Sequence, residues 1–285
     1  MLKKIRVKFE RSKAFKRFRR SKVAIFGSAI VIAFLAMGIF APIIAPRRPE
    51  SLTPGASFRS PSTDFFFGTD NIGRDIFSWF VWGSRTSLVV GAGAVFIELL
   101  IGVPLGMLAG YYGKWIDQIL MRITDIMLCL PGTIILIVAS SMFETRSVFL
   151  LMVIMGALGW PMLARITRAQ FLSLKELSYV EEARAIGVSD IRIIIRHIFP
   201  STIPSIVVLA TLDLPWYIVN EATLTFLGLG DPTAVSWGLM VSLGKTYLRR
   251  APWVSTFPGL AIFLATLGFN LFGDGLRDAL DVRTK

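Results

Sequence analysis

Six long stretches with few or no charged side chains run through this chain of 285 residues. A helix needs about 20 consecutive apolar residues to cross the hydrocarbon core of a bilayer. Residues 23–44, for example, lie inside an uncharged run between Lys22 and Arg47. The pattern predicts an all-α integral membrane protein with six transmembrane helices. The expected spans are residues 23–44, 86–110, 119–143, 147–164, 205–227 and 251–273.

The composition agrees with a membrane environment and excludes several functions. Hydrophobic residues make up 54% of the chain and charged residues only 18%, whereas about 25% of a soluble domain is charged. The net charge of +12 could suggest nucleic-acid binding, but 11 of the 31 Lys and Arg lie in residues 1–22. Cys129 and His197 are the sole residues of their types. We therefore expect no nucleic-acid partner, no disulfide framework and no His/Cys metal site.

The distribution of Lys and Arg predicts the orientation of the spans. Cytoplasmic loops carry an excess of these residues, and 22 of the 31 fall on one side if residues 1–22, 109–122, 165–204 and 274–285 are cytoplasmic. Residues 45–83 and 228–250 are then extracytoplasmic, and both termini face the cytoplasm. The first apolar run is longer than the roughly 7–15 residues of a signal-peptide core, so cleavage is not expected. The basic tail either rests on anionic lipid or acts only as a topology signal.

Residues 165–204 form a cytoplasmic loop too long for a simple connection between spans four and five. A capping box at residues 173–176 predicts the start of a helix. Gly187 is suited to end that helix in a left-handed conformation. Ser189 can cap a second helix, which Pro200 should close. The pattern predicts a helix–turn–helix elbow, and the alternative is a surface loop resting on headgroups.

Part of this elbow has a recognisable pattern. The sequence Glu181-Glu-Ala-Arg-Ala-Ile-Gly187, with Pro200 thirteen residues after the glycine, resembles the EAA loop of ABC-importer permeases. Glu182 stands where that loop usually has Ala, and Phe199 where it usually has Leu. The resemblance implies that Glu181, Glu182, Ala183, Gly187 and Pro200 couple the chain to separate ATPase subunits.

Further stretches resemble the C-type permease subunit of dipeptide, oligopeptide and nickel ABC importers. The resemblance covers residues 65–283, and Val282 departs from the ending usual in that family. The matching stretches are residues 67–75, 221–230, 236–238 and 273–281.

The resemblance implies a type I importer fold, with a permease core at residues 84–283, in a prokaryotic inner membrane. The implied partners are a homologous second permease, two ATP-binding subunits and an extracytoplasmic solute-binding protein. The implied solute is a di- or oligopeptide, although related importers carry glutathione, nickel chelates or oligosaccharides. The chain itself is expected to be no enzyme and to hold no cofactor, so that ATP and Mg²⁺ bind to partner chains. Its nearest approach to a P-loop, residues 238–246, has five residues between the glycines where four are needed.

Acidic residues inside the spans are the other candidates for function, because a carboxylate in hydrocarbon is costly. Asp213 and Glu221 are eight residues apart and face one side of a helix, where they could line a pathway. Glu221 could instead anchor the outer end of its helix. Asp125 is expected to pair with Arg122, three residues earlier. A self-contained secondary transporter that uses Asp213 and Glu221 as proton carriers is the alternative function, and its weakness is that it would not need the elbow.

Glycines at every fourth position of the second span need a separate explanation. Gly102, Gly106 and Gly110 place a smooth strip on one helix face, where another helix backbone can approach closely. We expect this strip to be a helix-packing surface.

Overall fold

The computed structural model describes residues 16–280, and these are mainly helical. Residues Leu2, Ile5 and Phe9 of the basic tail lie outside this range, as does Val282. The elements are α2 (Lys22–Ile39), α3 (Ala41–Ile44), α4 (Ile76–Tyr112), α5 (Lys114–Cys129), α6 (Gly132–Ser141), α7 (Val148–Leu174), α8 (Ser178–Ala185), α9 (Asp190–Arg192), the π-helix η1 (Ile193–Ile198), α10 (Phe199–Phe226), α11 (Trp237–Gly244), the 3-10 helix η2 (Lys245–Tyr247) and α12 (Trp253–Leu280).

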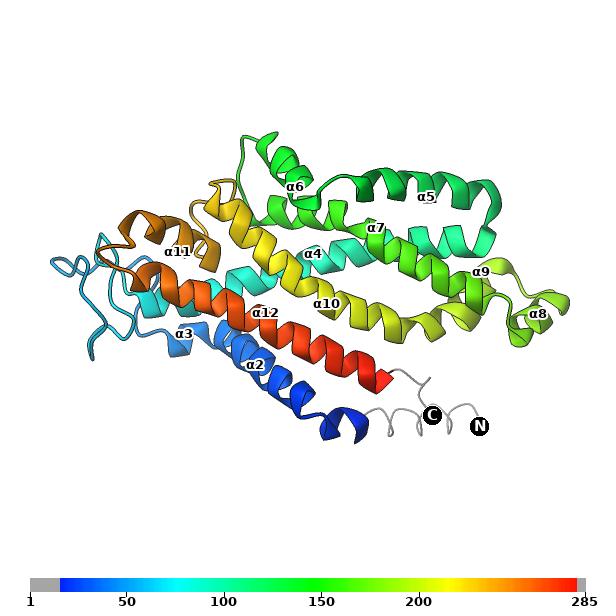
Figure 1. The fold of residues 1–285 in the computed structure, drawn as a ribbon, viewed down its shortest axis with the longest axis horizontal. Helices are drawn as coiled ribbons and strands as arrows, with labels where there is room; N and C mark the ends of the chain where they lie inside the picture. The colour runs from blue at the N-terminus through cyan, green and yellow to red at the C-terminus, as the bar shows by residue number, and fades with distance from the viewer. Residues whose placement is uncertain (1–15, 281–285) are drawn as a thin grey trace.

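Within residues 16–280, five helices are long and apolar enough to cross a membrane. They are α2, α4, α7, the continuous segment Asp190–Phe226 and α12. All five run along the long axis of the molecule (Figure 1). The elements α8 and α9 lie at one end, whereas α3, α11 and the segment before α4 lie at the other. The arrangement is that of an all-α membrane protein, as predicted.

The third predicted span, residues 119–143, is not one straight helix. The helices α5 and α6 meet at an angle of 88°, so the pair is either a sixth, broken span or a re-entrant loop. The break lies at Leu130 and Pro131, where both residues are extended, with ψ angles of 138° and 116°. A proline pushes the residue before it out of the helical region, which explains why the apolar run continues but the helix does not.

The long helices α4 and α7 pack closely along the predicted glycine strip. A methyl group built at Gly106 would lie 2.5 Å from the carbonyl oxygen of Ala164, and one at Gly110 would lie 2.5 Å from Cβ of Phe171. Gly102 likewise faces α7, at Trp160 and Leu163. The expectation of a helix-packing surface is confirmed. Small side chains let the two backbones approach, which gives van der Waals contact where lipid offers no hydrophobic driving force.

Candidate functional site

The elbow comprises residues 175–198, between α7 and α10, and its first half differs from prediction. Ser173 and Glu176 do not form a capping box, because α7 continues to Leu174 and places Ser173 in its last turn. The next helix, α8, begins at Ser178 instead. Apolar residues near the end of α7 explain the longer helix, since Phe171 is fully buried.

Gly187 ends α8 as predicted. Its φ angle is +80°. The amide of Val188 donates to the carbonyl of Ala183, and the amide of Gly187 donates to that of Arg184, both at 3.0 Å. These are the two bonds of a Schellman motif, which needs a left-handed residue that glycine adopts without strain.

The second half of the elbow also departs from prediction. Ser189 occupies the N-cap position of α9, but its side chain makes no capping hydrogen bond. Pro200 does not close the helix; it lies in the first turn of α10, and the helix runs on through it. In the preceding π-helix, the amide of Phe199 donates to the carbonyl of Ile194, five residues back. A proline is tolerated at such a start, where its missing N–H is not needed.

Buried apolar side chains hold the elbow against the ends of α4 and α7. Val180 and Ala183 pack with Ile193 and with Tyr111 and Phe171. Ala183 is therefore buried within this chain. By contrast, the neighbouring acidic side chains at 181 and 182 are exposed.

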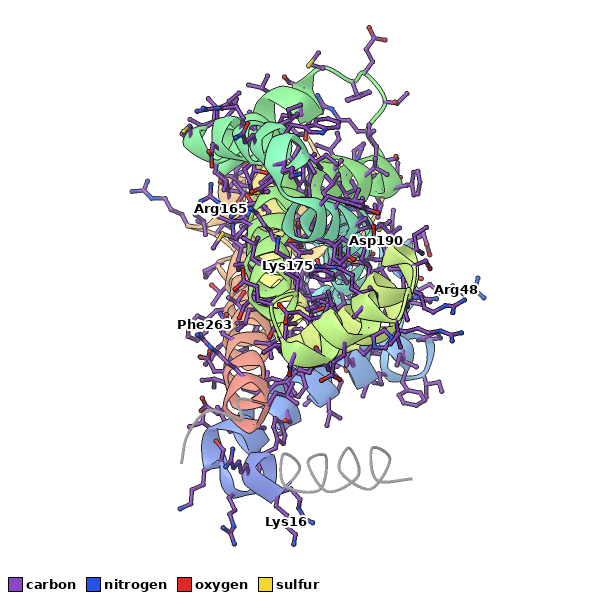
Figure 2. All side chains as sticks on the ribbon, turned by 90° about the vertical axis from the view of Figure 1, so that its right-hand side faces the viewer. Lys16, Arg48, Arg165, Lys175, Asp190 and Phe263 are labelled. Atoms are coloured by element: carbon purple, nitrogen blue, oxygen red, sulfur yellow. The ribbon has the colours of Figure 1, made fainter. Side chains whose placement is uncertain are left out.

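Polar contacts fix the elbow further. The hydroxyl of Tyr111 donates to a carboxylate oxygen of Asp190, and the guanidinium of Arg184 lies 5.9 Å from the Tyr111 ring centroid. Lys175 Nζ donates to the carbonyl of Gly110 at 3.0 Å. Figure 2 looks onto this end of the molecule and labels Lys175 and Asp190. The contacts join the elbow to the end of α4.

Ion pairs between α5 and α7 lie close to the same end. Arg168 binds both carboxylate oxygens of Asp117, and its Nη2 lies 2.6 Å from Oδ2. Asp125 pairs with Nη2 of Arg165 at 2.6 Å. The prediction that Asp125 pairs with Arg122 was wrong. Tertiary packing of α5 on α7 brings Arg165 closer to Asp125 than Arg122, its neighbour in the same helix.

Asp213 lines a cavity of about 240 Å³ between α4, α7, α10 and the broken span. Glu98, which interrupts the second apolar run, lines the same cavity as Asp213. The hydroxyl of Tyr217 donates to Glu98 Oε2 at 3.1 Å. Sequence reasoning did not name Glu98 as a site residue, and its charge inside an apolar run was the available signal.

Glu221 has different surroundings from Asp213. It is buried and accepts hydrogen bonds from Ser87 at 3.2 Å and from Thr225 at 3.0 Å. It is not among the residues that line the cavity beside Asp213. This geometry favours the structural alternative, in which Glu221 joins the outer parts of α4 and α10.

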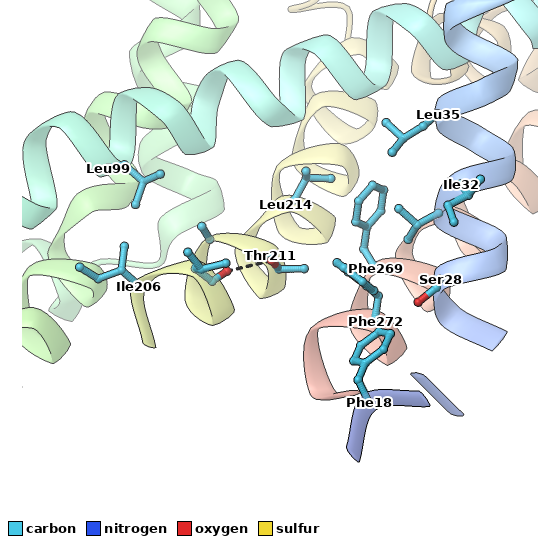
Figure 3. Close-up of a pocket in the computed structure, with 13 residues that line it drawn as sticks. Phe18, Ser28, Ile32, Leu35, Leu99, Ile206, Thr211, Leu214, Phe269 and Phe272 are labelled. Atoms are coloured by element: carbon cyan, nitrogen blue, oxygen red, sulfur yellow. Dashed lines mark hydrogen bonds between the residues drawn. The ribbon is translucent and has the colours of Figure 1, made fainter. Parts of the chain in front are cut away.

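A second, larger cavity of about 620 Å³ lies between α2, α10 and α12 (Figure 3). Its walls are apolar apart from Ser28 and Thr211. Both hydroxyls already donate to carbonyls of their own helices, at 2.6 and 2.8 Å. This groove therefore suits lipid or another helix rather than a polar solute. Nor do residues 16–280 contain a group of three or more His, Cys, Asp or Glu side chains able to hold a metal.

Comparison with known proteins supplies the family. Residues 102–285 match the family described as "binding-protein-dependent transport system inner membrane component", and residues 11–61 match the N-terminal transmembrane domain of oligopeptide transport permease C. The dipeptide transport system permease protein of Alkalihalophilus pseudofirmus is 41% identical over 95% of this chain and 90% of its own length. The glutathione transport system permease protein of Pectobacterium atrosepticum is 39% identical over the same shares.

A solved structure agrees at the level of the fold. A chain of the MetNI methionine ABC transporter, in an inward-facing conformation, matches with a TM-score of 0.55. The match covers 70% of this chain and 96% of that one, at 21% identity.

The sequence pattern, the helical membrane fold and the family matches agree with one another. They set aside the self-contained secondary transporter, because members of this family are non-catalytic membrane components that work with ATPase subunits and a binding protein. The chain is a multi-pass inner-membrane protein, and it belongs to the family of permease subunits of binding-protein-dependent ABC importers.

Proposed function

We propose that this permease forms half of the translocation pathway of a small-peptide importer and receives the motion of its ATPase subunits through the elbow. The observation that carries the proposal is the rigid seating of the elbow on three long helices. Its apolar side chains are buried against α4 and α7, and it continues into α10 without a break. A rigid element of this kind transmits a push to the spans, whereas a flexible loop would absorb it.

The outer surface of the elbow suits a protein partner. Ile186 and Ile191 are 81% and 67% exposed. Glu181 and Glu182 lie beside them and are also exposed. Large exposed apolar side chains rimmed by charge are typical of interaction sites. We assign this surface to an ATPase subunit, with Gly187 shaping the turn and Ala183 fixing α8 from beneath.

The solute follows from the relatives. The two named above transport a dipeptide and glutathione according to their names. Both solutes are small peptides. An extracytoplasmic binding protein would deliver such a peptide to a pathway between this chain and a homologous second permease, and two ATP-binding subunits would drive release to the cytoplasm.

Labelling from each side of intact cells tests the orientation. In a Cys129→Ala background, a cysteine at Asp190 should react only with reagents that reach the cytoplasm, because the elbow and both termini are assigned to that side. A cysteine at Ser60, in the exposed segment before α4, should react from outside. Labelling of position 190 from outside would overturn the orientation and the proposed role of the elbow together.

Cross-linking tests the proposed contact. A cysteine at Ile186, in the same background, should cross-link to a cysteine scan of the ATPase surface in the assembled complex, since this side chain is the most exposed apolar group of the elbow. A cysteine at Ile43 is the matched control. This side chain is 80% exposed, but it belongs to α3, at the end of the molecule opposite the elbow, so it should not cross-link. Absence of cross-linking at both positions would contradict the assignment of this surface to the ATPase.

A further inference from the structure

Two carboxyl groups meet near the middle of the membrane-spanning helices. Glu98 lies in the interior of α4 and Asp213 in that of α10, and both line the cavity of about 240 Å³. The hydroxyl of Tyr217 donates a hydrogen bond to Glu98. No Lys, Arg or His is found among the described residues that line this cavity. The pair therefore lacks a cationic partner from its own walls.

The cavity is built around this pair. Gly159 leaves the space that the Tyr217 hydroxyl occupies, since a methyl group built there would overlap that oxygen. Trp216 also lines the cavity, and 41% of its surface is exposed. Gly132, at the start of α6, lies opposite its ring, with 3.6 Å between a built methyl group and Cζ2. The remaining lining is mainly apolar: Met127, Leu128, Ile135, Leu136, Leu158, Pro161 and Met162.

We propose that Glu98 and Asp213, with the ring of Trp216, bind a primary ammonium group of the solute during its passage. The proposal rests on the pathway proposed above and names the chemical group that it recognises. Two adjacent carboxyl groups in an apolar site are stable when they share a proton or a cation. An ammonium group has three donors, enough for both carboxyls, and its charge is attracted to an indole face.

Other occupants fit the cavity less well. A hard metal cation takes six or more oxygen ligands or retains several waters, whereas this wall offers two carboxyl groups and a phenol. A volume of about 240 Å³ can take the amino end of a peptide but not a long chain. A proton alone would satisfy the pair but would not require the neighbouring Trp216.

Protection from carbodiimide labelling tests the site directly. Dicyclohexylcarbodiimide modifies protonated carboxyl groups in apolar surroundings, so it should label Glu98 or Asp213 in the complete transporter in liposomes. Glycylglycine, at about ten times its dissociation constant, should slow labelling about tenfold, whereas N-acetylglycylglycine should not. N-acetylglycyl-lysine carries its ammonium on the side chain. Protection by this probe would extend the site to side-chain ammonium groups, and its absence would restrict the site to the peptide terminus.

Equal protection by all three probes, or by none, would overturn the proposal. The proposal would also be overturned if carbodiimide labelled Glu98→Gln and Asp213→Asn to the same extent as the wild type. The labelling assay does not depend on the elbow. A negative result would therefore leave the proposed coupling intact, and failure of the coupling prediction would leave the ammonium site intact.

Transport supplies a second readout. Glu98→Gln and Asp213→Asn should each lower glycylglycine uptake about tenfold or more, because a charge-assisted hydrogen bond to the ammonium group is removed. ATP hydrolysis stimulated by loaded binding protein should persist. Asp125→Asn removes a carboxylate that pairs with Arg165 away from the cavity and should retain uptake. Normal uptake in the first two variants, or disappearance of the assembled complex, would contradict a binding role.

Discussion

Gly106→Ala should destabilise the protein, although alanine is the better helix former. In a helix interior, alanine is favoured over glycine by about 1 kcal/mol. At this position the added methyl group would lie 2.5 Å from the Ala164 carbonyl oxygen and 2.6 Å from Cβ of Thr167. Backbone atoms cannot rotate away, and overpacking of this kind costs about 1–3 kcal/mol. Thermal unfolding of the purified transporter should therefore begin at a lower temperature, with less assembled complex recovered from the membrane.

Gly259→Ala is the matched control. It makes the same substitution inside another long helix, α12, but a methyl group there meets no atom within 4 Å. We expect this variant to unfold at or above the wild-type temperature. Equal behaviour of the two variants would show that the close approach of α4 and α7 does not limit stability.

The long helices were predictable because their cause is local. An uncharged run of about 20 residues has few alternatives to a membrane helix, since backbone groups in lipid must be satisfied internally. The ends were less predictable. The helix α4 begins at Ile76, ten residues before the expected span, because Asp75 caps it with a 3.0 Å hydrogen bond to the amide of Ser78. Capping depends on one side chain, which hydropathy does not register.

Two prolines show why the sequence could not settle helix continuity. Pro131 breaks the third span, whereas Pro200 was expected to end a helix and instead begins one. The residue before Pro131 is extended, but the residue before Pro200 is helical, with φ and ψ of −52° and −42°. The preference against this conformation is overcome in the second case by the packing of Ile193, Ile194 and Ile198 in the elbow. Such packing depends on the tertiary structure and leaves no signal in the local sequence.

The candidate site was predicted unevenly for similar reasons. The left-handed turn at Gly187 was predicted correctly, because a Schellman turn has a strict conformational demand. The exposed isoleucines of the elbow were missed because their exposure depends on the tertiary structure. The Glu98–Asp213 contact was missed because the proximity of these two residues depends on it as well. Glu98 and Asp213 are separated by more than a hundred residues and meet only when α4 packs on α10.

Gly187→Val should abolish most solute uptake without preventing insertion. Valine at a φ of +80° is strained by about 1–2 kcal/mol, which is too little to unfold the protein. The turn relaxes by reorienting α8, and this displaces Ile186 and Glu182 from the surface assigned to the ATPase. A decrease of about 1.4 kcal/mol in the binding free energy weakens an interaction about tenfold. We expect uptake to fall about tenfold or more.

Gly228→Val separates this effect from backbone strain. Gly228 has the same φ of +80° and open space, and it follows α10 in the same motif, with bonds from Gly228 to Thr225 and from Leu229 to Leu224. It follows the C-terminal end of α10, whereas the elbow precedes the N-terminal end of this helix. The variant should carry the same strain yet retain most uptake. Equal reduction of uptake in both variants would assign the effect to strain alone.

Simultaneous measurement of solute uptake and ATP turnover in liposomes tests most directly whether ATP-driven motion enters this permease through the elbow. The transporter is reconstituted with its ATPase subunits and binding protein, using Gly187→Val and also Glu181→Lys, which reverses an exposed charge of α8. Our account predicts that both variants assemble in the membrane but lose uptake, together with either ATPase association or the stimulation of ATP hydrolysis by loaded binding protein. Wild-type uptake and wild-type ATP turnover in both variants would show that coupling enters the chain elsewhere.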